Sequence, residues 1–244
     1  MRVEFLGTGG YHPTERRHTA CIMLPEVGVL LDAGTSFFRV PARLRTRDLQ
    51  IFLSHAHLDH ICGLTYLLPS LLKGDVQTAR VYGTASTLAA VETHLLDESL
   101  FPIRPGYEFI ELADEIVVPG EGVLTHVPLN HPGGSTGFKI VWPERSLAYI
   151  TDTTADGSYR DFIQGVDLLI HECCLPDGQA EWAAKTGHSH TTAVAELARD
   201  SGVGRLVLVH LDPSLADDDP VGMDVARATF PATEMAEDFC CIDF

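Results

Sequence analysis

The chain has 244 residues, of which 45% are hydrophobic and 21% charged, and its net charge is −17. Such a composition is ordinary for a globular protein with a sizeable core. A protein that neutralises many phosphates of a long nucleic acid uses clustered lysine and arginine, so this charge argues against such a partner.

Short apolar runs that end in Gly, Pro, Asp or His predict β-strands. In chain order they lie at residues 3–6, 20–24, 29–32, 51–54, 80–82, 115–118, 123–128, 138–142, 146–150, 168–172 and 205–210. Apolar residues at helical spacing predict helices at about 58–72, 84–96 and 191–201. Thr191 or Thr192 is the expected cap of the last helix. We find no repeat or linker, and we expect a single domain over residues 1–244.

No apolar run approaches the roughly 18 residues of a membrane helix, so we expect no membrane partner. Met1 leads directly into a strand-like segment, which predicts that there is no signal peptide. Six cysteines without a CxxC motif favour reduced thiols over a disulfide framework. Together these features predict a cytoplasmic protein. Cys62 is expected to pack in the core or to add a metal ligand.

The motif HAHLDH places His55, His57, Asp59 and His60 directly after the apolar run at residues 50–54. Residues two apart share one side of an extended chain, so His55 and His57 can approach one point. If a helix starts within the motif, Asp59 and His60 can serve a second point. Imidazole and carboxylate are ligands that zinc and similar divalent metals prefer. The motif therefore predicts a metal site, with room for two metals.

Four ligands cannot fill two coordination spheres, so further ligands are expected downstream. His131, Asp152 and His210 each lie at or just after the C-terminal end of a predicted strand. Sheet proteins often gather their sites at that edge. Each residue alone is weak evidence, because such positions also hold turn-forming Asp and structural His. Together with HAHLDH they strengthen the prediction of a dinuclear centre.

The order HxHxDH, His, Asp, His resembles the metallo-β-lactamase fold superfamily, specifically its phosphodiesterase and ribonuclease Z-like branch. Most of the chain shares in the resemblance. The matching blocks are VEFLGTGG (residues 3–10), VLLDAG (29–34), NHPGGSTGF (130–138), DLLIHE (167–172) and the segment from GHSH to LVLVH (187–210). The resemblance implies an α/β fold, a four-layer αβ/βα sandwich of two mixed β-sheets flanked by helices. It places the metals at one edge, between the sheets.

The resemblance also implies how the ligands are shared between two divalent metals, zinc or manganese. One metal takes His55, His57 and His131, the other takes Asp59, His60 and His210, and Asp152 bridges both. Two such metals activate water and polarise a phosphoryl or carbonyl group, which predicts a metal-dependent hydrolase.

Two residues are expected to act in the chemical step. Asp59 would bind metal and orient the attacking hydroxide. His188, in GHSH, matches the position of the general acid in the branch that the chain resembles. Imidazole suits this role because it titrates near neutral pH. His190 is the alternative general acid. It also remains open that neither histidine has this role. Glu172 could orient the general acid, and Asp32 either orients a metal-bound histidine or only forms a turn.

The sequence leaves four functions open. Only 20 residues separate His131 from Asp152, which leaves no room for the tRNA-gripping arm that ribonuclease Z carries there. The short interval favours the branch's small cyclic phosphodiesterases, acting on a small anionic substrate, although their cysteine-based structural zinc site is not evident. The alternatives are a hydrolase of a carboxyl ester, lactone or thioester, a tRNA 3′-processing endonuclease, and a non-catalytic carrier. The basic stretch at residues 39–47 is a solvated face, an anion clamp or a homodimer contact.

Overall fold

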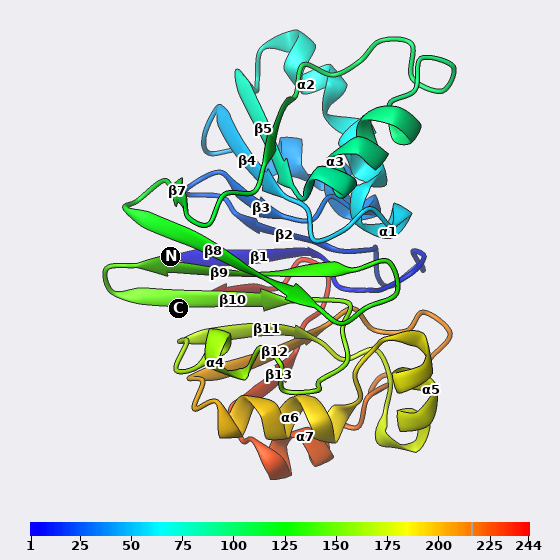
Figure 1. Cartoon of the computed structure of the whole chain (residues 1–244), viewed down its shortest axis with the longest axis vertical. Coiled ribbons are helices and arrows are strands. Elements are labelled where there is room, and N and C mark those ends of the chain that lie inside the picture. The colour runs from blue at the N-terminus through cyan, green and yellow to red at the C-terminus, as the bar shows by residue number, and fades with distance from the viewer. Residues whose placement is uncertain (216) are drawn as a thin grey trace. The chain divides into compact units, whose positions relative to one another are not determined.

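The computed structural model describes residues 1–215 and 217–244 and contains two seven-stranded β-sheets with helices against them (Figure 1). Contacts divide the chain into two compact units, residues 1–120 with 237–243 and residues 121–236 with 244. The single domain expected over residues 1–244 therefore stays a prediction. In the described part of the chain, no helix is both long and apolar enough to cross a membrane.

The first sheet lies in unit 1 and has the order β14-β1-β2-β3-β4-β5-β6. Strands β14 to β3 pair antiparallel, and strands β3 to β6 pair parallel. The parallel strands β3 and β4 therefore end at the same edge, with Leu31 beside Phe52. The strands are β1 (Arg2–Gly7), β2 (Cys21–Leu24), β3 (Val29–Leu31), β4 (Asp48–Phe52), β5 (Thr78–Gly83), β6 (Glu108–Glu111) and β14 (Cys241–Asp243).

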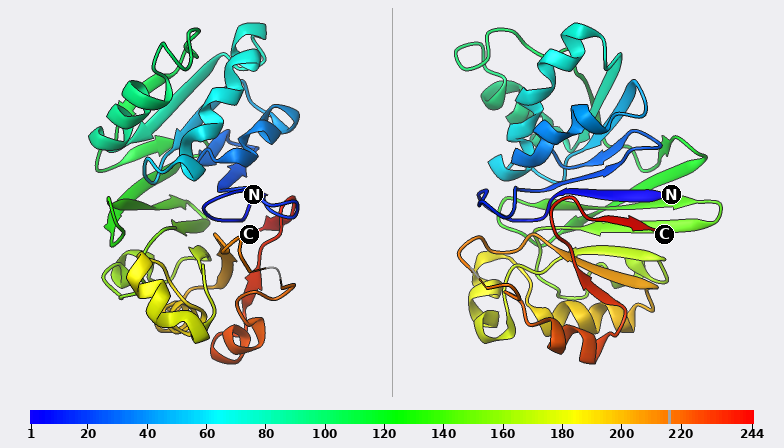
Figure 2. Two further views of the ribbon diagram at one scale, coloured as in Figure 1. Left: turned by 90° about the vertical axis from the view of Figure 1, so that its right-hand side faces the viewer. Right: turned by 180° about the vertical axis from the view of Figure 1, so that it is seen from behind.

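Helices cover one face of this sheet and bury its alternate residues, such as Leu49 and Ile51 (Figure 2). The helix expected at 58–72 is instead three pieces, because the backbone bends at Ile61 and restarts before Pro69, which fits only a first helical turn. The helical pieces of the unit are η1 (Thr35–Arg43), α1 (Leu58–Ile61), η2 (Cys62–Leu67), α2 (Leu68–Lys73), α3 (Ala85–Ala90) and the π-helical turn η3 (Val91–Leu95).

The second sheet has the order β13-β12-β11-β10-β9-β8-β7. Strands β8 to β10 form an antiparallel meander, and strands β10 to β13 run parallel. The C-terminal ends of β10, β11 and β12 consequently meet at one edge. The strands are β7 (Ile116–Val118), β8 (Gly122–Leu129), β9 (Ser135–Trp142), β10 (Arg145–Ile150), β11 (Leu168–Glu172), β12 (Arg205–Val209) and β13 (Thr233–Met235).

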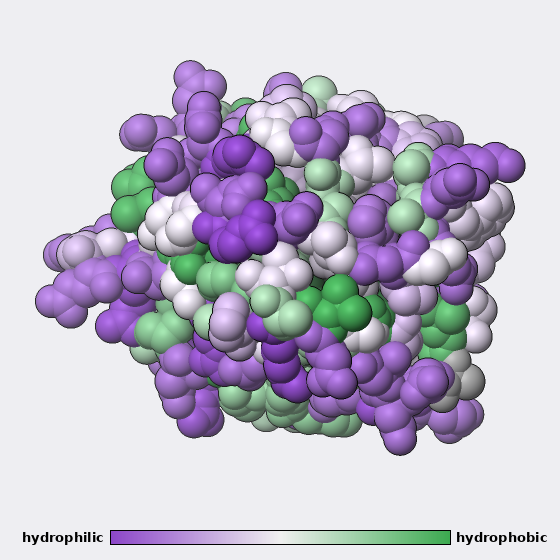
Figure 3. All heavy atoms as spheres, turned by 90° about the horizontal axis from the view of Figure 1, so that it is seen from below, coloured by the Kyte–Doolittle hydropathy of each residue, from purple (hydrophilic) through white to green (hydrophobic). Residues whose placement is uncertain are grey.

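Unit 2 buries its own apolar cluster between this sheet and its helices. Helix α6 contributes Val194, Leu197 and Ala198, as its spacing predicted. The face of the molecule below α6 and α7 in Figure 1 is mostly hydrophilic, with small apolar groups (Figure 3). The helical pieces are α4 (Arg160–Ile163), η4 (Asp177–Gln179), α5 (Ala180–Thr186), α6 (Thr191–Asp200) and α7 (Met223–Thr229).

The predicted cap of α6 is wrong. His190 occupies the N-cap position and its side chain makes no capping bond. The Asp177 carboxylate instead accepts a 2.8 Å hydrogen bond from the backbone N–H of Thr192. The Thr191 hydroxyl donates to the carbonyl of Val221. A carboxylate from outside the helix thus satisfies an N–H group that sequence reasoning assigned to a local threonine.

The fold class predicted from the sequence is confirmed as α/β with two mixed β-sheets flanked by helices. Each predicted strand overlaps an observed one. The sequence analysis missed β6, β13 and β14, which are strands of three or four residues at the edges of the sheets. Edge strands pair on one side only, so their apolar pattern is weak.

Candidate metal centre and active site

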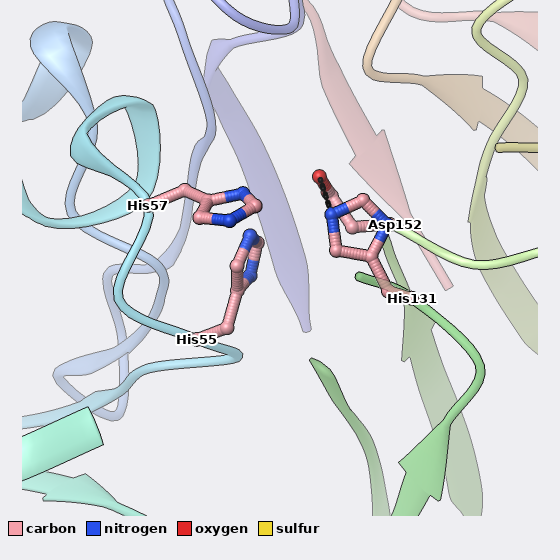
Figure 4. A group of neighbouring side chains, drawn as sticks. All are labelled: His55, His57, His131 and Asp152. Atoms are coloured by element: carbon pink, nitrogen blue, oxygen red, sulfur yellow. Dashed lines mark ion pairs between the residues drawn. The ribbon is translucent and has the colours of Figure 1, made fainter. Parts of the chain in front are cut away.

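Unit 1 brings together the first two histidines of HAHLDH. His55 and His57 lie on the segment that leaves β4, and their ring centroids are 4.3 Å apart (Figure 4). His55 is buried, with 4% of its surface exposed, whereas His57 is exposed. The Ser54 hydroxyl lies 3.0 Å from Nδ1 of His55. This contact holds the His55 ring by one nitrogen.

Asp59 and His60 converge on one another in the first turn of α1. The helix starts at Leu58, with His57 as its N-cap. The Oδ2 atom of Asp59 lies 3.3 Å from Nε2 of His60, and it also accepts a 2.9 Å hydrogen bond from the backbone N–H of Tyr11. The carboxylate and the imidazole thus present their ligand atoms together.

Asp32 contacts His60 at Nδ1, the ring nitrogen on the side away from Asp59. Its Oδ2 atom lies 2.8 Å from Nδ1 of His60, and both side chains are fully buried. The same carboxylate accepts hydrogen bonds from the N–H and the hydroxyl of Ser54. Asp32 adopts a left-handed backbone, with φ of 60°, a conformation that Asp tolerates better than most residues. A Cβ on Gly34 would lie 2.1 Å from the carbonyl of Asp59, so only glycine lets the turn lie this close to the motif.

In unit 2, Asp152 lies between two of the predicted ligands. Its Oδ1 atom is 3.2 Å from Nε2 of His210, and its Oδ2 atom is 3.7 Å from Nε2 of His131. Figure 4 shows the contact with His131 as a dashed line. Asp152 and His210 follow β10 and β12 and have φ of 48° and 59°. Strained backbone of this kind collects at functional sites.

His188 lies next to these ligands and is held by Glu172. The ring centroid of His188 is 5.1 Å from that of His131 and 5.3 Å from that of His210. Its Nδ1 atom lies 2.9 Å from Oε1 of the fully buried Glu172. Burial opposes ionisation of Glu172, but the charge of His188 and its hydrogen bond outweigh burial and lower the pKa of Glu172. Glu172 is therefore a fixed anion that orients the His188 ring.

Three backbone N–H groups fix the Glu172 carboxylate itself. Thr153 donates to Oε1 at 2.9 Å, and Cys174 and Ser189 each donate to Oε2 at 3.1 Å. A carboxylate that accepts several such bonds stays ionised. His190, the rival general acid, points its Nδ1 atom at Asp177, 2.7 Å away. It therefore serves a surface pair, and His188 is the histidine whose ring lies beside those of His131 and His210.

The donor set fits divalent metal ions. Metal-binding histidines usually use one ring nitrogen for a protein hydrogen bond and the other for the metal. Here Nδ1 of His131 donates to the carbonyl of Gly187 at 2.9 Å, and Nδ1 of His60 contacts Asp32. In both residues Nε2 faces a predicted carboxylate ligand. Imidazoles and carboxylates arranged in this way suit zinc, manganese and similar cations.

Comparison with known proteins assigns the chain to a family. A model of the beta-lactamase superfamily domain matches residues 28–211, which is most of the chain. The chain belongs to the metallo-β-lactamase superfamily. Ribonuclease Z of Synechococcus sp. (strain CC9605) is 31% identical over 312 residues, covering 100% of this chain and 98% of that protein. This member of the superfamily is a metal-dependent hydrolase.

Solved structures show the same fold for this metallo-β-lactamase superfamily member. The metallo-beta-lactamase fold protein YhfI from Bacillus subtilis matches with a TM-score of 0.84 and 20% identity, over 99% of each chain. A protein described as a new diphosphatase from the PhnP family matches with a TM-score of 0.76 and 19% identity, over 100% of this chain and 98% of the other. At such identities the likeness shows the fold.

The arginines at residues 39–47 of this superfamily member bind inside unit 1. Arg39 contacts Asp238, Arg43 contacts Glu4, and Arg45 contacts Glu26. Arg47 donates to the carbonyl of Gly74. Each has a partner within its own unit, which supports a structural role over an anion clamp.

Several contacts that hold the candidate ligands escaped the sequence analysis. Thr151 donates its hydroxyl to Oδ1 of Asp152 at 2.7 Å, and Ser135 donates to the carbonyl of Thr151 at 3.1 Å. Tyr11 contacts Asp59 through its backbone, with a strained φ of 57°. Hydroxyls and backbone groups of this kind carry no sequence signal. Only the strand-end position of Thr151, next to Asp152, would have pointed to it.

Proposed function

We propose that this hydrolase cleaves a small phosphodiester, cyclic ones included, with two divalent cations, zinc or manganese. The observation that carries the proposal is Asp152, which turns one carboxylate oxygen to His210 and the other to His131. A carboxylate placed in this way suits a bridge between two cations. Beside it, His188 and Glu172 form a pair that can deliver a proton. Metal ligation and proton delivery are both needed to expel a poor leaving group from a diester.

The proposed centre joins ligands from both units. Each unit supplies part of the set, and membership of the superfamily supports combining them. The family model spans both units, which also supports one functional domain over residues 1–244. We assign His55, His57 and His131 to one cation, Asp59, His60 and His210 to the other, and Asp152 to both.

The chain's own residues carry out the remaining steps. The cations, when bound, supply an activated water and polarise the phosphoryl group. Asp59 orients the attacking water, because its carboxylate is held by the Tyr11 backbone and lies beside His60. His188 donates a proton from Nε2 to the departing oxygen, while its Nδ1 atom stays bonded to Glu172. Glu172 thereby fixes the ring orientation and stabilises its protonated form.

Charge and length favour a small substrate over RNA. The net charge of −17 opposes a long polyanion. The ribonuclease Z alignment spans 312 positions, whereas this chain has 244 residues, so the relative contains segments that this chain lacks. The described diphosphatase of the same fold acts, by its name, on a phosphate compound. None of the six cysteines is in a disulfide, which supports a reducing, cytoplasmic setting.

Processing of tRNA 3′ ends is the second candidate. It is favoured by the curated relatives, which are named ribonuclease Z and ribonuclease BN and align with 98% or more of this chain. The same metal and proton-transfer groups would serve either substrate.

A direct comparison of substrates tests the proposal. The purified chain, loaded with zinc or manganese, is assayed on bis(p-nitrophenyl) phosphate, on a 2′,3′-cyclic nucleotide, on a precursor tRNA with a 3′ trailer, and on a lactone. The Asp152→Ala variant serves as the control for contaminating nucleases. We expect metal-dependent turnover of the small diesters and little cleavage of the RNA. Specific cleavage of the RNA at the trailer with no small-diester activity would replace the first candidate by the second. Turnover of the lactone alone would contradict both.

A further inference from the structure

A buried cysteine lies against the proposed general acid. Cys174 follows β11, which runs parallel to β12 and pairs Glu172 with Val209. Beyond that pair, the N–H of Cys173 donates to the carbonyl of Val209 at 2.9 Å, and the N–H of Asp212 donates to the carbonyl of Cys174 at 3.1 Å. These bonds continue the pairing past the strand ends. They hold Cys174 beside the segment that contains His210.

Within unit 2, the side chains of Cys174, His188 and His210 form a cluster that includes the thiol. One ligand atom from each lies within 4.8 Å of the other two. The rings of His188 and His210 are stacked at 5.3 Å, with an interplanar angle of 26°. Cys174 is 8% exposed. Neither the ligand assignment of the catalytic cations nor the proton transfer uses this thiol.

We propose that Cys174, His188 and His210 form a binding site for one thiophilic cation, such as Cd²⁺ or excess Zn²⁺, that shares His210 with the proposed catalytic centre, and that its occupation inhibits the enzyme. Thiolate sulfur and imidazole nitrogen are both zinc ligands, and three protein ligands leave a fourth position for water. In a tetrahedral site with bonds of about 2.0–2.3 Å, ligand atoms lie roughly 3.5 Å apart. Side-chain rotations that move the ligand atoms by about 1 Å would bring the three atoms from their present spacing to that of a bound cation.

The binding step exchanges a proton for the cation. The S–H bond of Cys174 breaks, its proton passes to solvent, and the sulfur keeps the electron pair that forms the bond to the cation. Thiolate is a soft ligand that selects soft cations, whereas Mn²⁺ prefers carboxylate, carbonyl and water. The site therefore discriminates against manganese. A buried thiol with two imidazoles beside it therefore binds soft cations in preference to manganese.

Occupation of this site removes two groups from catalysis. A cation on His188 blocks the nitrogen that would protonate the leaving group, and a cation on His210 competes with its role as a ligand. The inhibition, though not the binding, rests on the proposed role of His188. Small additions of Cd²⁺ should therefore stop an enzyme that manganese supports. Cys174 is the residue that sets this sensitivity.

The test is a Cd²⁺ titration of the manganese-loaded protein, followed through the ultraviolet charge-transfer band of cadmium bound to thiolate. We expect a band that saturates at one Cd²⁺ per chain. Cys174→Ser should abolish it. Cys173→Ser is the matched control, because the Cys173 sulfur contacts Leu175 and Thr191 instead, and this variant should keep the band. A band that persists in Cys174→Ser, or one that is lost only in Cys173→Ser, overturns the site.

Two further measurements complete the test. In wild type, ¹¹³Cd NMR should show one resonance in the range of mixed sulfur and nitrogen ligands, and spectra with only nitrogen and oxygen ligands overturn the site even if a variant fails to fold. The Cd²⁺ concentration for half-inhibition should rise by at least about 10-fold in Cys174→Ser, and an unchanged value contradicts the inhibitory role. The two spectroscopic readouts need no substrate, so they decide the site independently of the proposed function.

Discussion

The Nδ1 atom of His188 lies 2.9 Å from Oε1 of Glu172. Glu172 is fully buried and ionised, and three backbone N–H groups hold its carboxylate. This contact fixes the Nδ1 side of the His188 ring, so the proposed proton transfer would use Nε2. It makes proton delivery separable from metal binding, since Glu172 is no ligand in the proposed centre.

Loss of His188 should depend on the leaving group. His188→Ala should lower the rate about 10²- to 10⁴-fold on a diester whose alkoxide leaves only when protonated. A nitrophenolate departs without a proton, so its hydrolysis should slow much less. Steady-state kinetics on the two substrates measure the difference. His190→Ala is the control, because His190 pairs with Asp177. Equal losses on both substrates, or loss of a metal, would show that His188 has another role.

Replacement of Glu172 should damage both stability and proton delivery. In Glu172→Gln, an amide NH₂ group would face backbone N–H donors that now find a carboxylate oxygen. Buried unsatisfied donors cost about 1–3 kcal/mol each, so the free energy of unfolding in urea should fall. The activity loss should show the same leaving-group dependence as that of His188→Ala. Glu181→Gln, at an exposed position of α5, should be neutral, and equal effects of the two changes would refute the role of Glu172.

Asp32 should support metal binding without touching the metal. Asp32→Asn removes the charge that lies 2.8 Å from Nδ1 of His60. Loss of such a partner lowers metal affinity about 10- to 100-fold, and titration against a chromophoric chelator measures it. Asp177→Asn removes the charge from a more exposed pair with His190 outside the proposed centre and should leave the affinity unchanged. If both variants bind metal as wild type does, Asp32 serves only the turn.

The sequence was informative wherever a candidate ligand follows an apolar strand. HAHLDH, Asp152 and His210 could be singled out as candidate ligands because the buried strands before them read as apolar runs and parallel strands of each sheet end at one edge of that sheet. The left-handed backbone at Asp32, Asp152 and His210 could not be predicted, because Asp and His occupy that region only when the surrounding contacts hold them there. The bond from His131 to the Gly187 carbonyl joins residues 56 positions apart. No local pattern encodes it.

His171 should make stability depend on pH. Burial lowers the pKa of His171 below the ordinary 6.5, although its hydrogen bond to the Glu172 carbonyl and the charge of Glu172 oppose the shift. The unfolded chain therefore takes up a proton at higher pH than the folded one. Neutral His171 therefore contributes fully to the free energy of unfolding above about pH 6.5, and this contribution is lost as pH falls toward the pKa of His171 in the folded protein. The free energies of unfolding of wild type and His171→Gln are measured in urea across a pH series. Their difference should be constant above pH 6.5 and should change below it. A difference independent of pH would contradict the neutral state of His171.

The number of metal ions bound per chain decides whether the centre is dinuclear. The purified chain is saturated with zinc or manganese, freed of loosely bound ion, and measured by elemental analysis beside Asp152→Ala. We expect close to two ions per chain in wild type. Asp152→Ala should lose affinity at both positions, because a bridging carboxylate holds two cations together against their repulsion. At most one ion per wild-type chain under saturating metal would contradict the dinuclear centre.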